Sequence, residues 1–191
     1  MKKFLRLTKE GNFGGAYVES VNGIDFSSGV FPGGEIFFRL NHILQEGDDV
    51  TILARINSSK DLMEVVMAKD ALDRAGVKSV HLYAPYLPYA RQDRVCHQGE
   101  SLSLKVFARI INSCNFDNVV SLDVHSTVAE ALINNLTSIY DKRFYKDILE
   151  YHGLDKPYIV APDAGAEKRA SMVKNTLGEK CRDVVQCTKV R

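Results

Sequence analysis

The chain has 191 residues, of which 45% are hydrophobic and 26% charged; this is the composition of a globular protein of one domain or slightly more, and it argues against intrinsic disorder. Lysine and arginine together number 25, and aspartate and glutamate 24, so the formal charge is +1. Proteins that bind nucleic acid non-specifically, or anionic membranes, normally carry a larger basic excess, so both classes are disfavoured. No apolar stretch is long enough to span a membrane, and the first residues lack the apolar segment of a signal peptide.

The four cysteines have neither the C-x-x-C spacing of a redox pair nor the spacing of a zinc site. Scattered cysteines in a chain of this length are typical of reduced thiols. We therefore expect a cytoplasmic protein.

The N-terminal region contains two glycine clusters, at residues 11–15 and 23–34, which predict turns between short strands. From residue 50 the pattern becomes regular. The β-branched run at 50–54 predicts a buried strand, and the apolar spacing over 61–75 predicts a helix that ends at Gly76.

Strands and helices then alternate along the rest of the chain. We expect strands at residues 77–83, 118–122, 158–161 and 183–187, and helices at 101–114, 127–134, 141–151 and 166–177. Two prolines make residues 85–89 a shaped loop. This alternation predicts an α/β fold: a parallel sheet flanked by helices, with right-handed crossovers and a short-strand region at its N-terminal side. Ligands of such sheets bind beyond the carboxyl ends of the strands.

Polar side chains follow three of the predicted strands. The segments are YARQDR at residues 89–94, DVHS at 123–126 and PDAGAEKR at 162–169. Taken singly, each has an ordinary structural explanation, as solvated arginines, a helix cap, a structural histidine or a turn. Together they offer carboxylates and an imidazole for a divalent cation, and arginine forks for phosphate oxygens. The residues alone therefore favour a site for Mg²⁺ with a nucleotide or a sugar phosphate.

The segment YLPYARQDR at residues 86–94 resembles the Y-x-x-Y-A-R-Q-D-[RK] signature of the ribose-phosphate pyrophosphokinases. Further segments follow in the family's order: FPGGE at 31–35, LME at 62–64, DALDRA at 70–75, DVHS at 123–126, APDAGA at 161–166 and the closing KVR at 189–191. The resemblance implies a type I phosphoribosyltransferase-like domain. It also implies Mg²⁺-dependent transfer of a pyrophosphoryl group from ATP to ribose 5-phosphate, with release of AMP, in a cytoplasmic homo-oligomer whose ATP site is shared between subunits.

The same resemblance implies a role for each matching residue. Arg91, Gln92, Asp93 and Arg94 would serve ATP binding, together with Phe31 and Glu35 from a neighbouring subunit; His125, Asp163 and Asp123 would form the metal site; and Lys189, Arg191 and His125 would act in catalysis. Residues 1–181 would form the family's N-terminal domain, and residues 182–191 would begin the connection to a C-terminal domain.

The chain also departs from the family pattern. Gly33 stands where the family has Asp or Asn, and Cys96 stands near an Asp that helps to bind nucleotide. The family's ribose-5-phosphate loop would lie beyond Arg191, so we expect the chain alone to be inactive. Two alternatives stay open: a non-catalytic relative that regulates or assembles with a complete synthetase, and another nucleotide-binding or phosphoribosyl-handling α/β protein.

Overall fold

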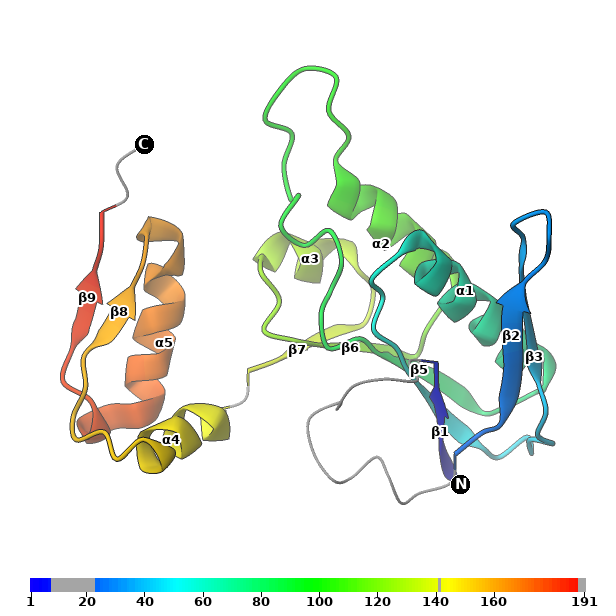
Figure 1. Cartoon of the computed structure of the whole chain (residues 1–191), viewed down its shortest axis with the longest axis horizontal. Coiled ribbons are helices and arrows are strands. Elements are labelled where there is room, and N and C mark those ends of the chain that lie inside the picture. Colours follow the sequence, from blue (N-terminus) through cyan, green and yellow to red (C-terminus); the bar gives the residue numbers. More distant parts are fainter. Residues whose placement is uncertain (8–22, 141, 189–191) are drawn as a thin grey trace. The chain divides into compact units, whose positions relative to one another are not determined.

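The computed structural model of the chain describes residues 1–7, 23–140 and 142–188. The chain forms two compact units, Met1–Ile139 and Tyr140–Arg191 (Figure 1). Among the described residues, no helix is both long and apolar enough to cross a membrane.

The first unit is built on a five-stranded sheet in which all neighbouring strands are parallel, in the order β1-β4-β5-β6-β7. The strands are β1 (Lys2–Arg6), β4 (Asp49–Leu53), β5 (Ser79–Tyr83), β6 (Asn118–Leu122) and β7 (Leu136–Ile139). The parallel sheet that the sequence predicts is therefore confirmed. The sequence did not predict β7, because LTSI is a run of four residues with two hydroxyl side chains.

Three helices connect the successive strands from β4 to β7: α1 (Ser59–Arg74), α2 (Ser103–Ser113) and α3 (Thr127–Leu132). The strand order advances in one direction, so right-handed crossovers put all three helices on the same face of the sheet, as Figure 1 shows. α1 begins at a capping box, in which the Ser58 hydroxyl accepts from the Asp61 N–H and the Asp61 carboxylate accepts from the Ser58 N–H. Gly76 follows the helix with a φ of 71°, a conformation that glycine adopts without strain.

The core of the first unit lies between this face of the sheet and the helices. Alternate residues of β4 and β5, such as Ile52 and Leu82, point to the same side and are buried, together with Phe107 of α2 and Leu72 of α1. Burying a large apolar side chain of this kind stabilises the fold by about 1.5–3 kcal/mol. The core thus fixes the sheet from which the loops at its carboxyl edge emerge.

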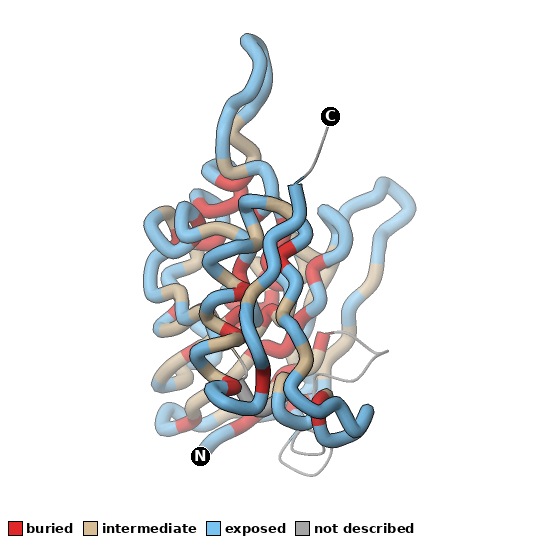
Figure 2. Tube along the Cα trace, turned by 90° about the vertical axis from the view of Figure 1, so that its left-hand side faces the viewer, coloured by how far each residue is buried: buried red, intermediate tan, exposed pale blue. Residues whose placement is uncertain are grey.

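A separate antiparallel hairpin, β2 (Phe26–Val30) and β3 (Ile36–Leu40), forms the short-strand region. Phe26 and Phe38 stack with ring centroids 5.2 Å apart and pack against the core, and β3 lies against α1. The turn closes through a hydrogen bond from the Phe31 N–H to the Glu35 carbonyl at 2.7 Å. Its residues are exposed, and Figure 2 shows a hairpin that is pale blue at its tip.

The second unit is a single β-α-β element preceded by a helix. Its elements are α4 (Lys142–Tyr151), β8 (Ile159–Ala161), the 3₁₀ turn η1 (Ala164–Ala166), α5 (Glu167–Leu177), the 3₁₀ turn η2 (Gly178–Lys180) and β9 (Val184–Gln186). β8 and β9 pair in parallel, and the buried cluster comprises Leu149, Val173, Leu177 and Cys181. The boundary predicted at residues 181 and 182 falls inside this unit and stays a prediction about the family's domains.

Candidate functional site

A cavity of about 620 Å³ lies in the first unit, where the chain leaves the carboxyl ends of β5 and β6. It is lined by residues of the β5–α2 loop, by the start of α2 and by the turn after β6. These residues are Arg91, Gln92, Asp93, Arg94, Cys96, Glu100, Ser101, Ser103 and His125. Two of the polar segments that the sequence singled out, YARQDR and DVHS, therefore meet at one cavity.

The β5–α2 loop is held at its base and exposed beyond it. Leu87 and Ala90 are buried, and Tyr89 adopts a φ of 61° with its ring 5.8 Å from that of Phe107. The Gln92 N–H donates to the Tyr89 carbonyl at 2.8 Å, and the Gln92 carbonyl accepts from the N–H of Leu104 in α2 at 3.3 Å. The base of the cavity loop is therefore held against α2, while the loop itself projects beyond that helix (bright green in Figure 1).

The side chains of the four consecutive residues Arg91 to Arg94 differ in their exposure and in their hydrogen-bond partners. Arg91 and Gln92 are exposed, and within the described part of the chain no hydrogen bond or ion pair engages their side chains. Asp93 instead turns inward, with 9% of its side chain exposed, and pairs with the guanidinium of Arg94 through the Arg94 Nε at 2.9 Å. The Arg94 guanidinium is the main cause that lowers the pKa of Asp93 to about 2, with smaller contributions from the Ser126 hydroxyl and the His125 charge.

The turn after β6 carries His125 and is anchored to β7. Asp123 has a φ of 45°, and its N–H donates to the Ile139 carbonyl at 3.0 Å. The N–H of the buried Val124 donates to the Ser138 hydroxyl at 3.3 Å, and the Ser126 hydroxyl caps α3 by accepting from the Val128 N–H at 3.2 Å. His125 itself is exposed and lines the cavity. The strand that the sequence did not predict therefore holds the turn that carries the predicted histidine.

Three cavity residues were not among those predicted for the site: Glu100, Ser101 and Ser103. The Glu100 carboxylate accepts from the N–H of Cys96 at 2.9 Å and of His97 at 3.1 Å, which closes the outer loop on itself. The signal available in the sequence was the cluster ESLS just before an apolar helical pattern, which is typical of a capped loop-to-helix junction.

Comparisons with known proteins bear directly on these residues. A family model described as the N-terminal domain of ribose phosphate pyrophosphokinase matches residues 19–114, half of the chain. The chain belongs to the ribose-phosphate pyrophosphokinase family. The matched span includes the hairpin and the loop residues Arg91 to Arg94, whereas His125 lies beyond its end.

Individual members of the ribose-phosphate pyrophosphokinase family are similar to this chain over most of its length. Ribose-phosphate pyrophosphokinase of Pyrococcus abyssi is 31% identical over 155 residues, covering 78% of this chain and 51% of its own length. That of Thermoplasma acidophilum is 30% identical over 151 residues, with coverages of 78% and 51%. The chain thus spans about half the length of the curated relatives that it matches.

The fold is likewise that of a solved family structure. The crystal structure of phosphoribosylpyrophosphate synthetase from Mycobacterium smegmatis superposes with a TM-score of 0.81 at 23% sequence identity, covering 100% of this chain and 65% of that one. This likeness confirms the predicted α/β fold of a parallel sheet flanked by helices.

The remaining predicted residues of a pyrophosphokinase site do not line this cavity. Phe31 and Glu35 lie at the tip of the hairpin, with 51% of Phe31 exposed. Asp163 belongs to the second unit, where its Oδ1 accepts from the Ala166 N–H at 3.1 Å and caps the turn η1 before α5. Lys189 and Arg191 lie outside the described residues.

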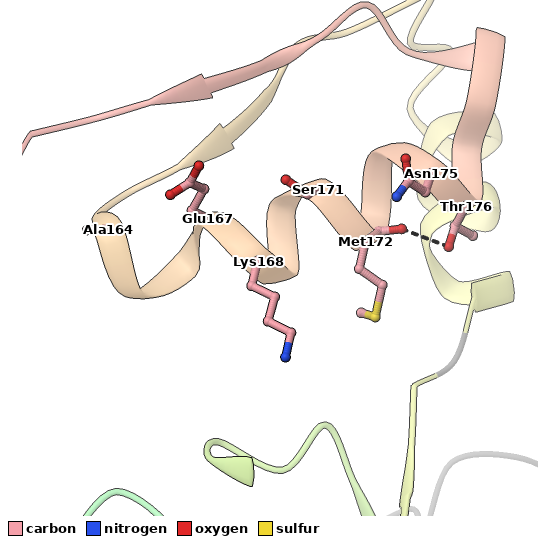
Figure 3. Close-up of a pocket in the computed structure, with 7 residues that line it drawn as sticks. All are labelled: Ala164, Glu167, Lys168, Ser171, Met172, Asn175 and Thr176. Carbon is pink, nitrogen blue, oxygen red and sulfur yellow. Dashed lines mark hydrogen bonds between the residues drawn. The ribbon is translucent and has the colours of Figure 1, made fainter.

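The second unit has a cavity of its own, of about 660 Å³, along one side of α5 (Figure 3). Its lining residues follow helical spacing and come from α5 and the turn before it: Ala164, Glu167, Lys168, Ser171, Met172, Asn175 and Thr176. In Figure 3 the Lys168 and Met172 side chains extend from the same side of the helix. The Thr176 hydroxyl donates a hydrogen bond to the Met172 carbonyl at 3.0 Å. Ala164, Glu167 and Lys168 belong to the polar segment at residues 162–169, but none of the residues to which the sequence assigned a role lies in this cavity.

The metal-ligating side chains near the first cavity are suited to a metal ion that is already coordinated by the phosphates of a nucleotide. Among the described residues, no group of three or more His, Cys, Asp or Glu side chains gathers as a cation site. Mg²⁺ in nucleotide enzymes commonly takes one or two protein ligands and completes its shell with water and substrate phosphates, so such a group is not required. Carboxylate oxygens are the harder ligands, and Asp123 therefore suits Mg²⁺ better than the His125 imidazole does.

Proposed function

We propose that this chain is the ATP-binding N-terminal half of a ribose-phosphate pyrophosphokinase, which transfers a pyrophosphoryl group from ATP to ribose 5-phosphate. The observation that supports this role is the first cavity, where Arg91, Gln92 and His125 meet at the carboxyl edge of the sheet. Both Arg91 and Gln92 present side chains without protein partners in the described part of the chain. A guanidinium fork and an amide of this kind can bind phosphate oxygens and a nucleobase.

Transfer of the pyrophosphoryl group requires mainly that the reacting groups are positioned and that the developing charge is stabilised. The anomeric oxygen of ribose 5-phosphate forms a bond to the β-phosphorus of ATP, the bond from that phosphorus to the oxygen retained by the α-phosphate breaks, and AMP leaves. The hydroxyl proton passes to solvent. Arg91 would orient the phosphates and His125 would donate to a phosphate oxygen or to a water at the edge of the cavity. We assign to Lys189 and Arg191 the role of stabilising the negative charge that develops on the transferring phosphates.

Magnesium would supply neutralisation of the phosphate charge when bound. His125, Asp123 and Asp163 are the residues we assign to its site, with the carboxylates as the preferred ligands. In the first unit Asp123 and His125 share one anchored turn. We further assign residues 1–181 to the family's N-terminal domain and residues 182–191 to the start of the connection that follows it, in a cytoplasmic enzyme.

The hairpin supports a shared site in a homo-oligomer. Phe31 and Glu35 are exposed at its tip, and the Phe31 ring packs on that of Phe37 with centroids 5.1 Å apart. An exposed aromatic ring of this kind offers a stacking surface for a base. In our proposal, Phe31 and Glu35 of one subunit complete the adenine pocket formed by Arg91 and Gln92 of its neighbour.

The experiment that tests this function compares two variants. One is Arg91→Ala, and the other is a control in which an exposed lysine away from the cavity is replaced by alanine. We expect R91A to weaken Mg–ATP binding by about 30-fold, measured by titration calorimetry, because a charge-assisted contact to phosphate is lost. Lys60→Ala removes an exposed cation at the start of α1, outside both cavities, and should change the affinity less than twofold. In the natural full-length protein, AMP should form from ATP only when ribose 5-phosphate is added. ADP as the product, or equal binding by R91A and wild type, would contradict the proposal.

A second candidate is a non-catalytic relative that assembles with a complete synthetase. Two observations favour it: Cys96 lines the cavity where the family pattern has an acidic residue nearby, and Gly33 puts no side chain at the hairpin position where the family has Asp or Asn. Stable co-purification with a complete homologue, combined with no turnover by the full-length protein itself, would support this candidate over the first.

A further inference from the structure

The outer part of the cavity loop is closed by a turn that ends at Glu100. The Glu100 N–H donates to the His97 carbonyl at 3.2 Å, and Gly99, the third residue of that turn, has a φ of 91°. A β-turn with a positive φ at its third position favours glycine there, because glycine adopts this conformation without strain. The chain therefore reverses its direction between His97 and Glu100.

The side chain of Glu100 closes the same turn a second time. Its Oε2 accepts from the Cys96 N–H at 2.9 Å and from the His97 N–H at 3.1 Å. Glu100 and His97 thus bind each other in both directions, since each donates its backbone N–H to the other. Hydrogen bonds to an ionised acceptor are stronger than those between neutral groups. One carboxylate oxygen thereby fixes two consecutive backbone groups in a stretch, residues 94–100, whose members are all exposed.

The negative charge of Glu100 is unfavourable in a cavity for phosphate. Glu100 lines the cavity of about 620 Å³ together with Arg91, Arg94 and Cys96. A carboxylate repels an anion, so its charge at this position opposes the binding of a polyphosphate. The two N–H groups that donate to its oxygen give the side chain a role that does not depend on contact with the ligand.

We propose that Glu100 is a positioning residue, whose side-chain oxygen holds the turn of residues 96–100 closed. The closed turn keeps the outer wall of the cavity, formed by Arg94, Cys96 and Glu100, in place for the nucleotide. The inference rests on the proposed function for the identity of the ligand, whereas the closure of the turn is a property of the protein without ligand. What the turn requires is the acceptor oxygen and not the negative charge.

Two substitutions separate the oxygen from the charge. Both N–H groups donate to the same atom, so Glu100→Gln keeps one acceptor oxygen for them, whereas Glu100→Ala removes it. Without nucleotide, E100A should raise the hydrogen-exchange rates of the Cys96 and His97 amides, measured by NMR, by about tenfold, and E100Q by less than about threefold. The matched control is Asp70→Ala, which removes an exposed carboxylate whose partner Arg74 also lies four residues away, at 2.7 Å in α1. D70A should leave both amides unchanged.

Binding of Mg–ATP, measured by titration calorimetry, gives the second readout. E100A should weaken it by about tenfold, and E100Q should bind at least as tightly as the wild type, because it keeps the oxygen and removes the repulsion. A metal ion held by the carboxylate would give the opposite result for E100Q, since Mg²⁺ prefers charged carboxylate ligands. Gly99→Ala leaves the carboxylate in place but should weaken binding to a similar extent as E100A. A Cβ at this position meets no neighbouring atom, so the effect comes from the strained φ alone.

Unchanged exchange of the Cys96 and His97 amides in E100A would overturn the proposal, as would an equal loss of binding in E100A and E100Q. If E100A also accelerates exchange in β5 and β6, that variant is unfolded, and G99A then decides: wild-type affinity in G99A overturns the proposal, and a loss of about tenfold supports it. Failure of the wild type to bind Mg–ATP would contradict the proposed function alone, since the exchange results stand without nucleotide.

Discussion

The two units of this chain carry the same kind of sequence signal in very different surroundings. In the first unit, polar residues follow β5 and β6 of a five-stranded sheet; in the second, Asp163 and its neighbours follow β8 of a two-stranded one. The first sheet buries a contiguous core that extends from β1 to α3, and the second covers the smaller cluster around Leu177. A polar residue after a strand becomes part of a site only where several anchored loops converge on it.

Hydrogen bonding separates the two regions further. In the first unit, the segments that line the cavity are held by other elements: the Gln92 carbonyl accepts from the Leu104 N–H of α2, and the Val124 N–H donates to the Ser138 hydroxyl of β7. The Asp163 carboxylate accepts from Ala166, three residues away, so its described contact is local. The described contacts of the first unit therefore join separate elements, whereas that of Asp163 lies within its own turn. Three changes can break or sharpen this contrast.

The largest expected effect concerns the two cores. Phe107→Ala should lower the free energy of unfolding of the first unit by about 3–5 kcal/mol, since the ring is almost fully buried and its removal leaves a cavity. The matched change in the second unit, Leu177→Ala, should cost about 2 kcal/mol, because the smaller cluster can collapse around the gap. Urea unfolding followed by hydrogen exchange on peptides from each unit measures both values. Equal losses would contradict the difference between the cores.

The next effect concerns Asp163. Asp163→Ala should destabilise the second unit by about 1 kcal/mol, because the cap on the Ala166 N–H is lost, whereas Asp163→Ser keeps a capping oxygen and should cost only a few tenths. The pair also tests the proposed metal role, since serine restores the cap but not the carboxylate. If D163S leaves the Mg²⁺ requirement of the full-length enzyme unchanged, Asp163 is a cap and the metal assignment is wrong.

The contrast between these regions also explains what the sequence could predict. Regular alternation predicted the strands from β4 to β6 and their helices to within a few residues, because buried β-branched runs and apolar helical spacing are local signals. β7 was missed because LTSI is a run of four residues with two hydroxyl side chains, and the low exposure of Asp93 was missed because RQDR looks uniformly polar. The position of the cavity was predicted from the motifs that follow the strand ends. Which of its side chains are exposed and which are paired could be learned only from the side-chain contacts.

The smallest expected effect is confined to acid pH and compares two aspartates with lowered pKa values. In the first unit Asp48 is 2% exposed in its side chain, and the Lys3 ammonium at 2.7 Å is the main cause that lowers its pKa from 3.8 to about 2, followed by the Gln45 N–H. In the second unit Lys174 lowers the pKa of Asp183, whose side chain is 70% exposed. Solvent screens an exposed pair more strongly than a buried one.

Both carboxylates are more acidic in the folded protein, so the unfolded chain binds more protons as the pH falls. The stability that Asp48 contributes is therefore complete above about pH 4 and is lost as the pH falls toward 2. Urea titrations between pH 2 and 5 should show a steeper decline for the first unit than for the second, and Asp48→Asn should flatten the former. Asp183→Asn should change the slope of the second unit only slightly, because its pair with Lys174 is open to solvent. If D48N keeps the wild-type slope, other carboxylates of the first unit dominate its acid response, and the buried Lys3–Asp48 pair does not distinguish the two units.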